Sequence, residues 1–103
     1  MEQFPNQESQ ERADLAEVLK IKGIEDKEVF EMLSNWTERK EQEVERIGTQ
    51  EAQLEFEIER AELYLEAGLI QEAIQALDDA YIIASNEGLS EYVKKIEEKI
   101  ASI

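Results

Sequence analysis

The sequence predicts an all-α fold built of antiparallel helical hairpins, and three observations carry that prediction. Four glycines and a single proline divide the 103 residues into segments of helix length. The residues between them are mostly glutamate, leucine, alanine, isoleucine, glutamine and lysine, which helices tolerate well. No long run of valine, threonine and tyrosine alternates with a period of two, so no sheet is expected. The length suits one domain, and we expect a disordered segment over residues 1–8 and a single helical domain over residues 9–103.

The first part of that domain, residues 9–48, is expected to hold two helices. Ser9 is the expected N-cap of the first helix, and Gly23 is its expected C-terminal stop. Asp26 is expected to cap the second helix, where a negative side chain also meets the positive end of the helix dipole. The apolar residues of this second helix are Val29, Phe30, Leu33, Trp36, Val44 and Ile47.

The dipeptide Gly48-Thr49 allows two interpretations. Glycine followed by threonine is typical of a helix stop and a new N-cap, which would open a second part over residues 49–103. Alternatively, one helix runs from Asp26 to Ala67. Residues spaced three and four apart form one stripe that continues through Gly48, as in a coiled coil. An interior glycine costs only about 1 kcal/mol relative to alanine. The sequence favours the break slightly.

The second part is expected to form a hairpin and one more helix. A helix ending at Ala67 turns at Gly68 into a helix over residues 71–85, and a turn at 86–88 precedes a last helix over 90–102. The inner face of the hairpin's second helix is expected to carry Ile70, Ala73, Ile74, Leu77, Ala80, Tyr81 and Ala84. The last helix carries a stripe that is expected to cover the hairpin: Leu89, Tyr92, Val93, Ile96, Ile100 and Ile103.

This hairpin resembles one tetratricopeptide repeat, the helix–turn–helix unit of about 34 residues. The residues that carry the resemblance, and the packing it implies, are Ala61, Tyr64, Gly68, Ala73, Leu77 and Ala80. The chain departs from the family pattern at Glu57, Arg60 and Ser85, where the family prefers tryptophan, leucine and proline. A generic antiparallel hairpin that reached alanine and glycine independently is the alternative.

No second copy follows at the same period, so the chain resembles a single repeat plus a capping helix over about residues 54–102. About three repeats are normally needed for a stable solenoid. The N-terminal helices or a second subunit are therefore expected to supply the missing packing. The resemblance implies a module that holds another protein.

The amino-acid composition excludes several kinds of functional site and partner. The absence of histidine and cysteine excludes Ser-His-Asp triads, Cys-His dyads and disulfides, and makes a structural zinc site very unfavourable. A net charge of −15 disfavours binding to nucleic acid and to anionic membrane, whereas a basic protein partner would be attracted. The polar, acidic N-terminus does not resemble a signal peptide, and no apolar run is long enough to span a bilayer. We therefore expect a cytoplasmic protein without a cofactor or metal.

Two groups of carboxylates are candidates for a catalytic site. Asp78 and Asp79 are adjacent and point about 100° apart on a helix, so they do not converge on one metal or proton. A second group shares one helix face: Glu55, Glu59, Glu62 and Glu66. Carboxylates so placed bind metals in helical bundles together with histidine, which this chain lacks. The sequence therefore predicts that the protein is not an enzyme.

Phe30, Trp36 and Val44 are the candidate interface residues. Aromatic residues at helical spacing usually lie in a core, which is the position the sequence favours for Phe30 and Trp36, yet tryptophan is also enriched in interfaces. Because the apolar pattern thins after Trp36, we expect a homodimer whose interface includes Trp36 and Val44. The predicted function is a non-enzymatic protein-interaction module, of adaptor, scaffold or chaperone-like kind, that holds a segment of a partner protein. The alternative is a self-associating helical protein that forms a coiled-coil-like homodimer.

Overall fold

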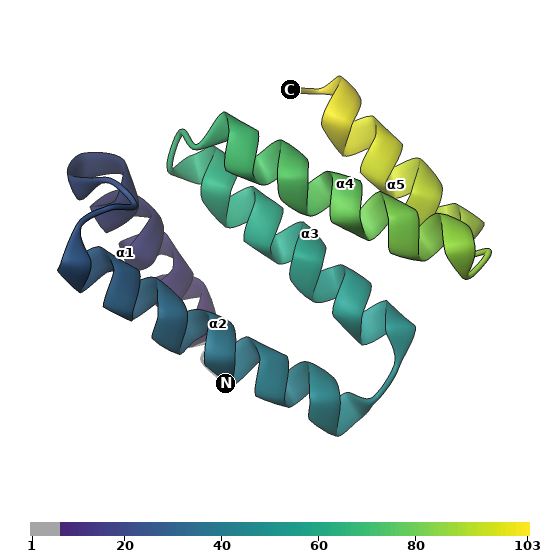
Figure 1. Ribbon diagram of the computed structural model, residues 1–103, viewed down its shortest axis with the longest axis horizontal. Helices are drawn as coiled ribbons and strands as arrows, with labels where there is room; N and C mark the ends of the chain where they lie inside the picture. Colours follow the sequence, from purple (N-terminus) through teal and green to yellow (C-terminus); the bar gives the residue numbers. More distant parts are fainter. Residues whose placement is uncertain (1–6) are drawn as a thin grey trace, which may run out of the picture.

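The computed structural model describes residues 7–103, and over this range it consists of helices joined by short turns (Figure 1). The helices are α1 (Gln7–Lys22), α2 (Lys27–Ile47), α3 (Gln50–Glu66), α4 (Ile70–Asn86) and α5 (Ser90–Ala101). No strand occurs among these residues, so the all-α prediction is confirmed. Within the same range, no helix combines the length and the apolar character needed to cross a membrane.

The start of α1 corrects one expectation. Most of the segment predicted to be disordered, residues 1–6, lies outside the described residues. The helix already begins at Gln7, so Ser9 lies inside its first turn and not at its N-cap. Helix ends commonly differ by one or two residues from a boundary inferred from sequence, because the first turn has no intrahelical acceptor for its N–H groups.

Capping residues fix the two ends of α2. The Asp26 carboxylate accepts a hydrogen bond from the Val29 N–H at 3.1 Å, as predicted. At the other end Gly48 adopts a φ of +78°, the left-handed region that glycine enters without steric cost. The Thr49 hydroxyl then accepts a hydrogen bond from the Ala52 N–H at 3.1 Å and starts α3. The predicted break is confirmed, and the continuous helix from Asp26 to Ala67 is wrong, because α2 and α3 diverge from this turn (Figure 1).

The central helix α3 is buried on two opposite faces. One face packs with α1 and α2 in a cluster that we call the N-terminal core: Leu15, Ala16, Leu19, Val29, Leu33, Trp36, Phe56, Leu63 and Ala67. The other packs with α4 and α5 in a cluster that we call the C-terminal core: Leu54, Ile58, Ala61, Ala73, Ala76, Leu77, Ala80, Ala84 and Ile96. The N-terminal helices thus supply the packing that a single hairpin lacks.

The last three helices are joined by two turns of the same build. In the first, Gly68 has a φ of +80° and the Leu69 N–H donates to the Tyr64 carbonyl at 2.8 Å. In the second, the Leu89 N–H donates to the Ala84 carbonyl at 2.9 Å. Bonds of this span satisfy carbonyl groups that the ending helix leaves free. Each turn therefore stops one helix and starts the next within a few residues.

Helix α5 covers the α3–α4 hairpin, as its apolar stripe predicts. Ile96 is fully buried in the C-terminal core. The partly buried residues of α5 and its preceding turn that pack against the same core are Leu89, Tyr92, Val93 and Ile100. Figure 1 shows α5 lying along α4, with the C-terminus near the start of α4.

Candidate functional site

The predicted hairpin residues meet at the crossing of α3 and α4. Ala61, Ala73, Leu77 and Ala80 are all fully buried in the C-terminal core. The small alanine side chains let the two helix axes approach closely. Tyr64 is half-buried and packs against both cores. These residues build the frame and do not offer a surface to a partner.

The predicted interface residues are separated by the structure. Trp36 is only 1% exposed and lies in the N-terminal core, where its ring centroid is 5.9 Å from that of Phe56. This placement confirms the core position that the sequence favours for Trp36, and it removes Trp36 from the predicted dimer interface. Val44 is half-buried against the same core, whereas Phe30 is 60% exposed. Phe30 lies about 100° around α2 from the buried Val29, so it points away from the core that Val29 enters.

The acidic face of α3 joins helices together. Arg12 of α1 approaches Glu62 at 3.3 Å and Glu66 at 3.1 Å. Lys40 of α2 approaches Glu59 at 3.1 Å. No group of three or more acidic, histidine or cysteine side chains within residues 7–103 is arranged to hold a metal ion. Glu59, Glu62 and Glu66 thus pair with basic side chains of α1 and α2.

The same face also anchors α5. Lys99 approaches Glu62 at 2.6 Å, and the Tyr92 hydroxyl donates a hydrogen bond to Glu55 at 2.7 Å. Burial alone would raise the pKa of Glu62, but the hydrogen bond and charge of Lys99, together with Arg12, outweigh it and lower that pKa. The hydrogen bond to Glu55 and partial burial raise the pKa of Tyr92 to about 12.

Glu57 and Arg60 form a largely buried ion pair on α3. Glu57 is 6% exposed and accepts hydrogen bonds at 2.9 Å from Arg60 and at 3.0 Å from Gln53. The Arg60 guanidinium lies over the Phe56 ring, 4.9 Å from its centroid. A charge this buried needs its partner, because an unpaired carboxylate away from water is costly. Arg60 thus neutralises Glu57 and also packs on Phe56 of the N-terminal core.

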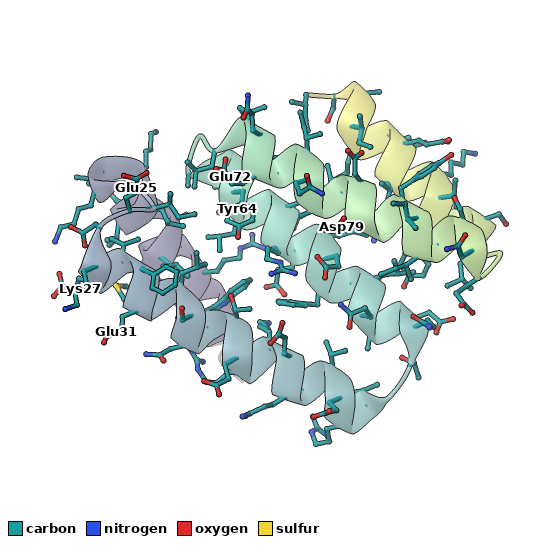
Figure 2. The ribbon with its side chains drawn as sticks, in the orientation of Figure 1. Glu25, Lys27, Glu31, Tyr64, Glu72 and Asp79 are labelled. Atoms are coloured by element: carbon teal, nitrogen blue, oxygen red, sulfur yellow. The ribbon has the colours of Figure 1, made fainter. Side chains whose placement is uncertain are left out.

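A small furrow of about 190 Å³ runs beside this pair, between α3 and α4. Figure 2 shows Tyr64 and Glu72 near the α3–α4 turn and Asp79 further along α4. Burial raises the pKa of the Tyr64 hydroxyl, and it outweighs the nearby charge of Arg60, which lowers that pKa, while the charges of Glu72 and Glu57 add to the rise. Asp79 accepts a hydrogen bond from Gln75 of its own helix at 3.2 Å, and Asp78 is exposed elsewhere on α4. The two adjacent aspartates do not converge.

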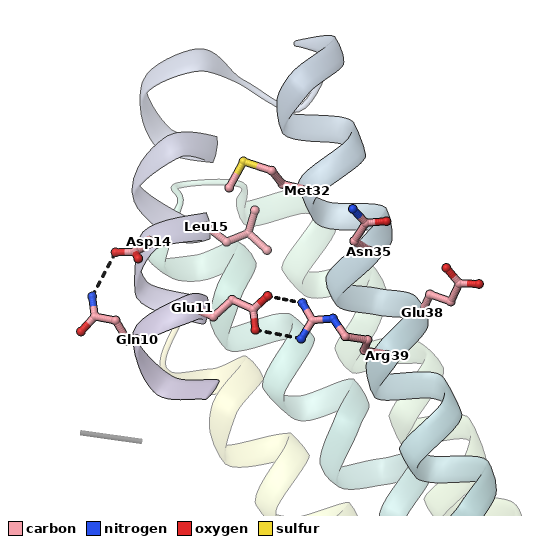
Figure 3. A pocket seen from close by; sticks show the side chains of 8 residues that line it. All are labelled: Gln10, Glu11, Asp14, Leu15, Met32, Asn35, Glu38 and Arg39. Carbon is pink, nitrogen blue, oxygen red and sulfur yellow. Dashed lines mark hydrogen bonds and ion pairs between the residues drawn. The ribbon is translucent and has the colours of Figure 1, made fainter. Parts of the chain in front are cut away.

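A larger groove lies between α1 and α2 and has a volume of about 790 Å³ (Figure 3). Met32 reaches from α2 towards α1 above Leu15, so one half of the groove is apolar. In the other half Glu11 and Arg39 form a two-pronged ion pair across the gap, with one of the two hydrogen bonds at 3.0 Å. The remaining lining residues are Gln10, Asp14, Asn35 and Glu38.

None of these groove residues was predicted from the sequence. Glu11 and Arg39 are 28 residues apart, so only the pairing of α1 with α2 brings them together. Met32 gave a weak signal, because it is an apolar residue outside the buried stripe of α2 and is 37% exposed. The sequence signal for the groove was therefore an apolar residue of α2 that lies outside the buried stripe and next to charged residues.

Comparison of the chain with protein-family models, with curated proteins and with solved structures finds no match.

Proposed function

We propose that this protein is a non-enzymatic interaction module that holds a segment of another protein against a helical frame. The observation that carries the proposal is the α1–α2 groove, because it is an open concavity with an apolar floor and polar rims. Binding sites for extended or helical segments share that character. The frame itself is held by two cores, so the groove is formed before a partner arrives.

The repeat resemblance supports the same proposal. Helix–turn–helix units with alanine at the crossing stack into scaffolds that present binding surfaces. We place this chain with such scaffolds, as one repeat-like hairpin flanked by the α1–α2 hairpin and the capping helix α5. We also place the protein in the cytoplasm, since a chain without cysteine suits a reducing compartment.

Site-specific photo-crosslinking in the source cells tests this function. A photoreactive amino acid replaces Asn35 in the groove of one variant, and Asp78 on the exposed face of α4 in a matched variant. We expect discrete crosslinked proteins from position 35 and none of them from position 78. Crosslinks that are absent at both positions, or identical at both, would contradict a partner held in the groove.

A further inference from the structure

We propose that the α1–α2 groove binds a short basic segment of the partner, in which one apolar side chain is flanked by lysines or arginines. The inference rests on the proposed function and adds the chemistry of the occupant. It follows from three features of the lining residues: the apolar half, the excess of carboxylates and the exposed ion pair.

The apolar half suits one inserted side chain. Leu15 is 1% exposed and forms the floor, whereas Met32 is 37% exposed and forms a wall. Methionine is unbranched and polarizable, so it adapts to side chains of different shape. A leucine or methionine of the partner placed between these two residues loses contact with water on both sides.

The charges of the lining select a basic segment. The lining holds three carboxylates, those of Glu11, Asp14 and Glu38, and one guanidinium, that of Arg39, so its formal charge is −2. The whole chain carries −15, so the surrounding field has the same sign. Complementary potentials speed encounter with a basic segment and repel an acidic one.

The Glu11–Arg39 pair shows how such a segment is recognised. Its two-pronged geometry is the arrangement in which carboxylates bind guanidinium groups most specifically. The Arg39 and Glu11 side chains are 54% and 40% exposed, so the pair holds the helices only weakly. An arginine of the partner therefore takes the place of Arg39 at Glu11 when the segment binds.

Fluorescence anisotropy with a labelled peptide tests the proposal. The probe carries one leucine between two pairs of arginine and lysine. The Asp14→Asn/Glu38→Gln variant is compared with Asp78→Asn/Glu98→Gln, which removes the same charge from exposed positions of α4 and α5. We expect the groove variant to bind about 2- to 30-fold more weakly than the control variant, the range that two exposed ion pairs supply. Equal affinities would show that only the overall charge attracts the peptide, and would overturn the proposal.

The peptide itself supplies a second comparison. Replacing its leucine with serine should weaken binding to the unaltered protein at least about 5-fold, because the apolar half loses its occupant. A peptide with glutamates in place of its basic residues should not bind. Undiminished affinity for the serine peptide would overturn the apolar part of the proposal.

Substitution of Arg39 in the ion pair gives the sharpest comparison, because it is expected to strengthen peptide binding, whereas most substitutions in a binding site weaken it. Arg39→Gln removes the competitor for Glu11, and Arg46→Gln removes the same charge from an exposed position at the far end of α2. We expect Arg39→Gln to tighten peptide binding a few-fold beyond Arg46→Gln, with both variants folded by circular dichroism. Equal or weaker binding by Arg39→Gln would overturn the displacement of Arg39.

Binding in the groove and the basic character of the bound segment are tested separately. Crosslinks from position 35 to a partner segment that is not basic would overturn this inference and leave the proposed function standing. An absence of crosslinks from position 35 would overturn the proposed function, whatever the peptide does.

Discussion

The two cores of this protein bury their residues by different means. The N-terminal core relies on large side chains, with Trp36 and Phe56 in contact at its centre. The C-terminal core contains five alanines, and its helices α3 and α4 form the most extensive helix pair in the described chain. Large side chains hold helices apart and fill the space between them, whereas alanines let the backbones approach. The first core should therefore be sensitive to the removal of atoms, and the second to their addition.

The largest effect is expected from removing the helix that only the C-terminal core uses. Truncation after Asn86 deletes α5 and opens the C-terminal core, because Ile96 and its partly buried neighbours are lost. Full burial of one isoleucine is worth about 1.5–3 kcal/mol, and marginal domains have only about 5–15 kcal/mol in total. We expect unfolding or aggregation, measured by thermal melting and light scattering.

The control for this truncation removes only Ser102 and Ile103, which are exposed and follow α5. This shorter deletion should leave the melting temperature unchanged. A chain truncated after Asn86 that remained monomeric and equally stable would mean that the C-terminal core does not need α5.

Trp36→Ala is the strongest single test of the N-terminal core. Truncating a fully buried tryptophan leaves a cavity and costs about 3–5 kcal/mol. Urea unfolding at several protein concentrations measures the loss, which should not depend on concentration because Trp36 is buried within one chain. Trp36→Phe is the control, since it keeps a ring and removes an indole N–H that has no hydrogen-bond partner among the described residues. A concentration-dependent loss would restore the homodimer interpretation.

The C-terminal core should respond to enlargement. Ala73→Leu forces extra atoms into the α3–α4 crossing and should cost roughly 1–3 kcal/mol. The matched control is Ala101→Leu, at an exposed position of α5, which should change the stability little. Thermal melting of both variants makes the comparison, and an unchanged melting temperature for Ala73→Leu would remove the main support for a repeat-like crossing.

The smallest effect concerns the acidic face of α3, which links the two halves. The folded pKa of Glu62 lies below its ordinary 4.5, so between these values the unfolded chain binds more protons than the folded one. The stability that Glu62 contributes is thus present above pH 4.5 and is lost as the pH falls through its folded pKa. The contribution is below about 1 kcal/mol, because the side chain is 34% exposed.

Urea unfolding from neutral pH to below pH 4.5 measures the contribution of ionised Glu62 to the free energy of unfolding. Glu62→Gln should flatten the fall in stability on acidification, whereas Glu98→Gln, an exposed position of α5, should not. Identical pH profiles for both variants would mean that Lys99 and Arg12 do not stabilise the ionised form.

Local signals made the helix boundaries predictable. Asp26, Gly48, Thr49 and Gly68 act within one turn of their own position, so their effect does not depend on the rest of the fold. The alanine crossing was predictable as well, because Ala73, Leu77 and Ala80 fall on one face of the helix. What the sequence did not show is which faces of distant helices meet.

The candidate site lies in that unpredictable part. Glu11 faces Arg39 only because α1 packs against α2, and the carboxylates of α3 meet cations from three other helices. Phe30 was expected to pack and is exposed, because it stands beside the stripe of Val29, Leu33 and Trp36 rather than within it. A periodic pattern predicts that a face is buried, but its partner depends on the whole arrangement.

The burial of α3 on two opposite faces limits how this chain can be divided into fragments that fold. A hairpin of α3 and α4 cut out for use elsewhere would expose Phe56, Leu63 and Ala67, which now lie in the N-terminal core. Conversely, a fragment of α1 and α2 alone would lose the face of α3 against which Trp36 packs. Opening either core loosens the helix that supports the other. The chain should therefore fold as one cooperative unit, in which the α3–α4 hairpin cannot be separated from its neighbours.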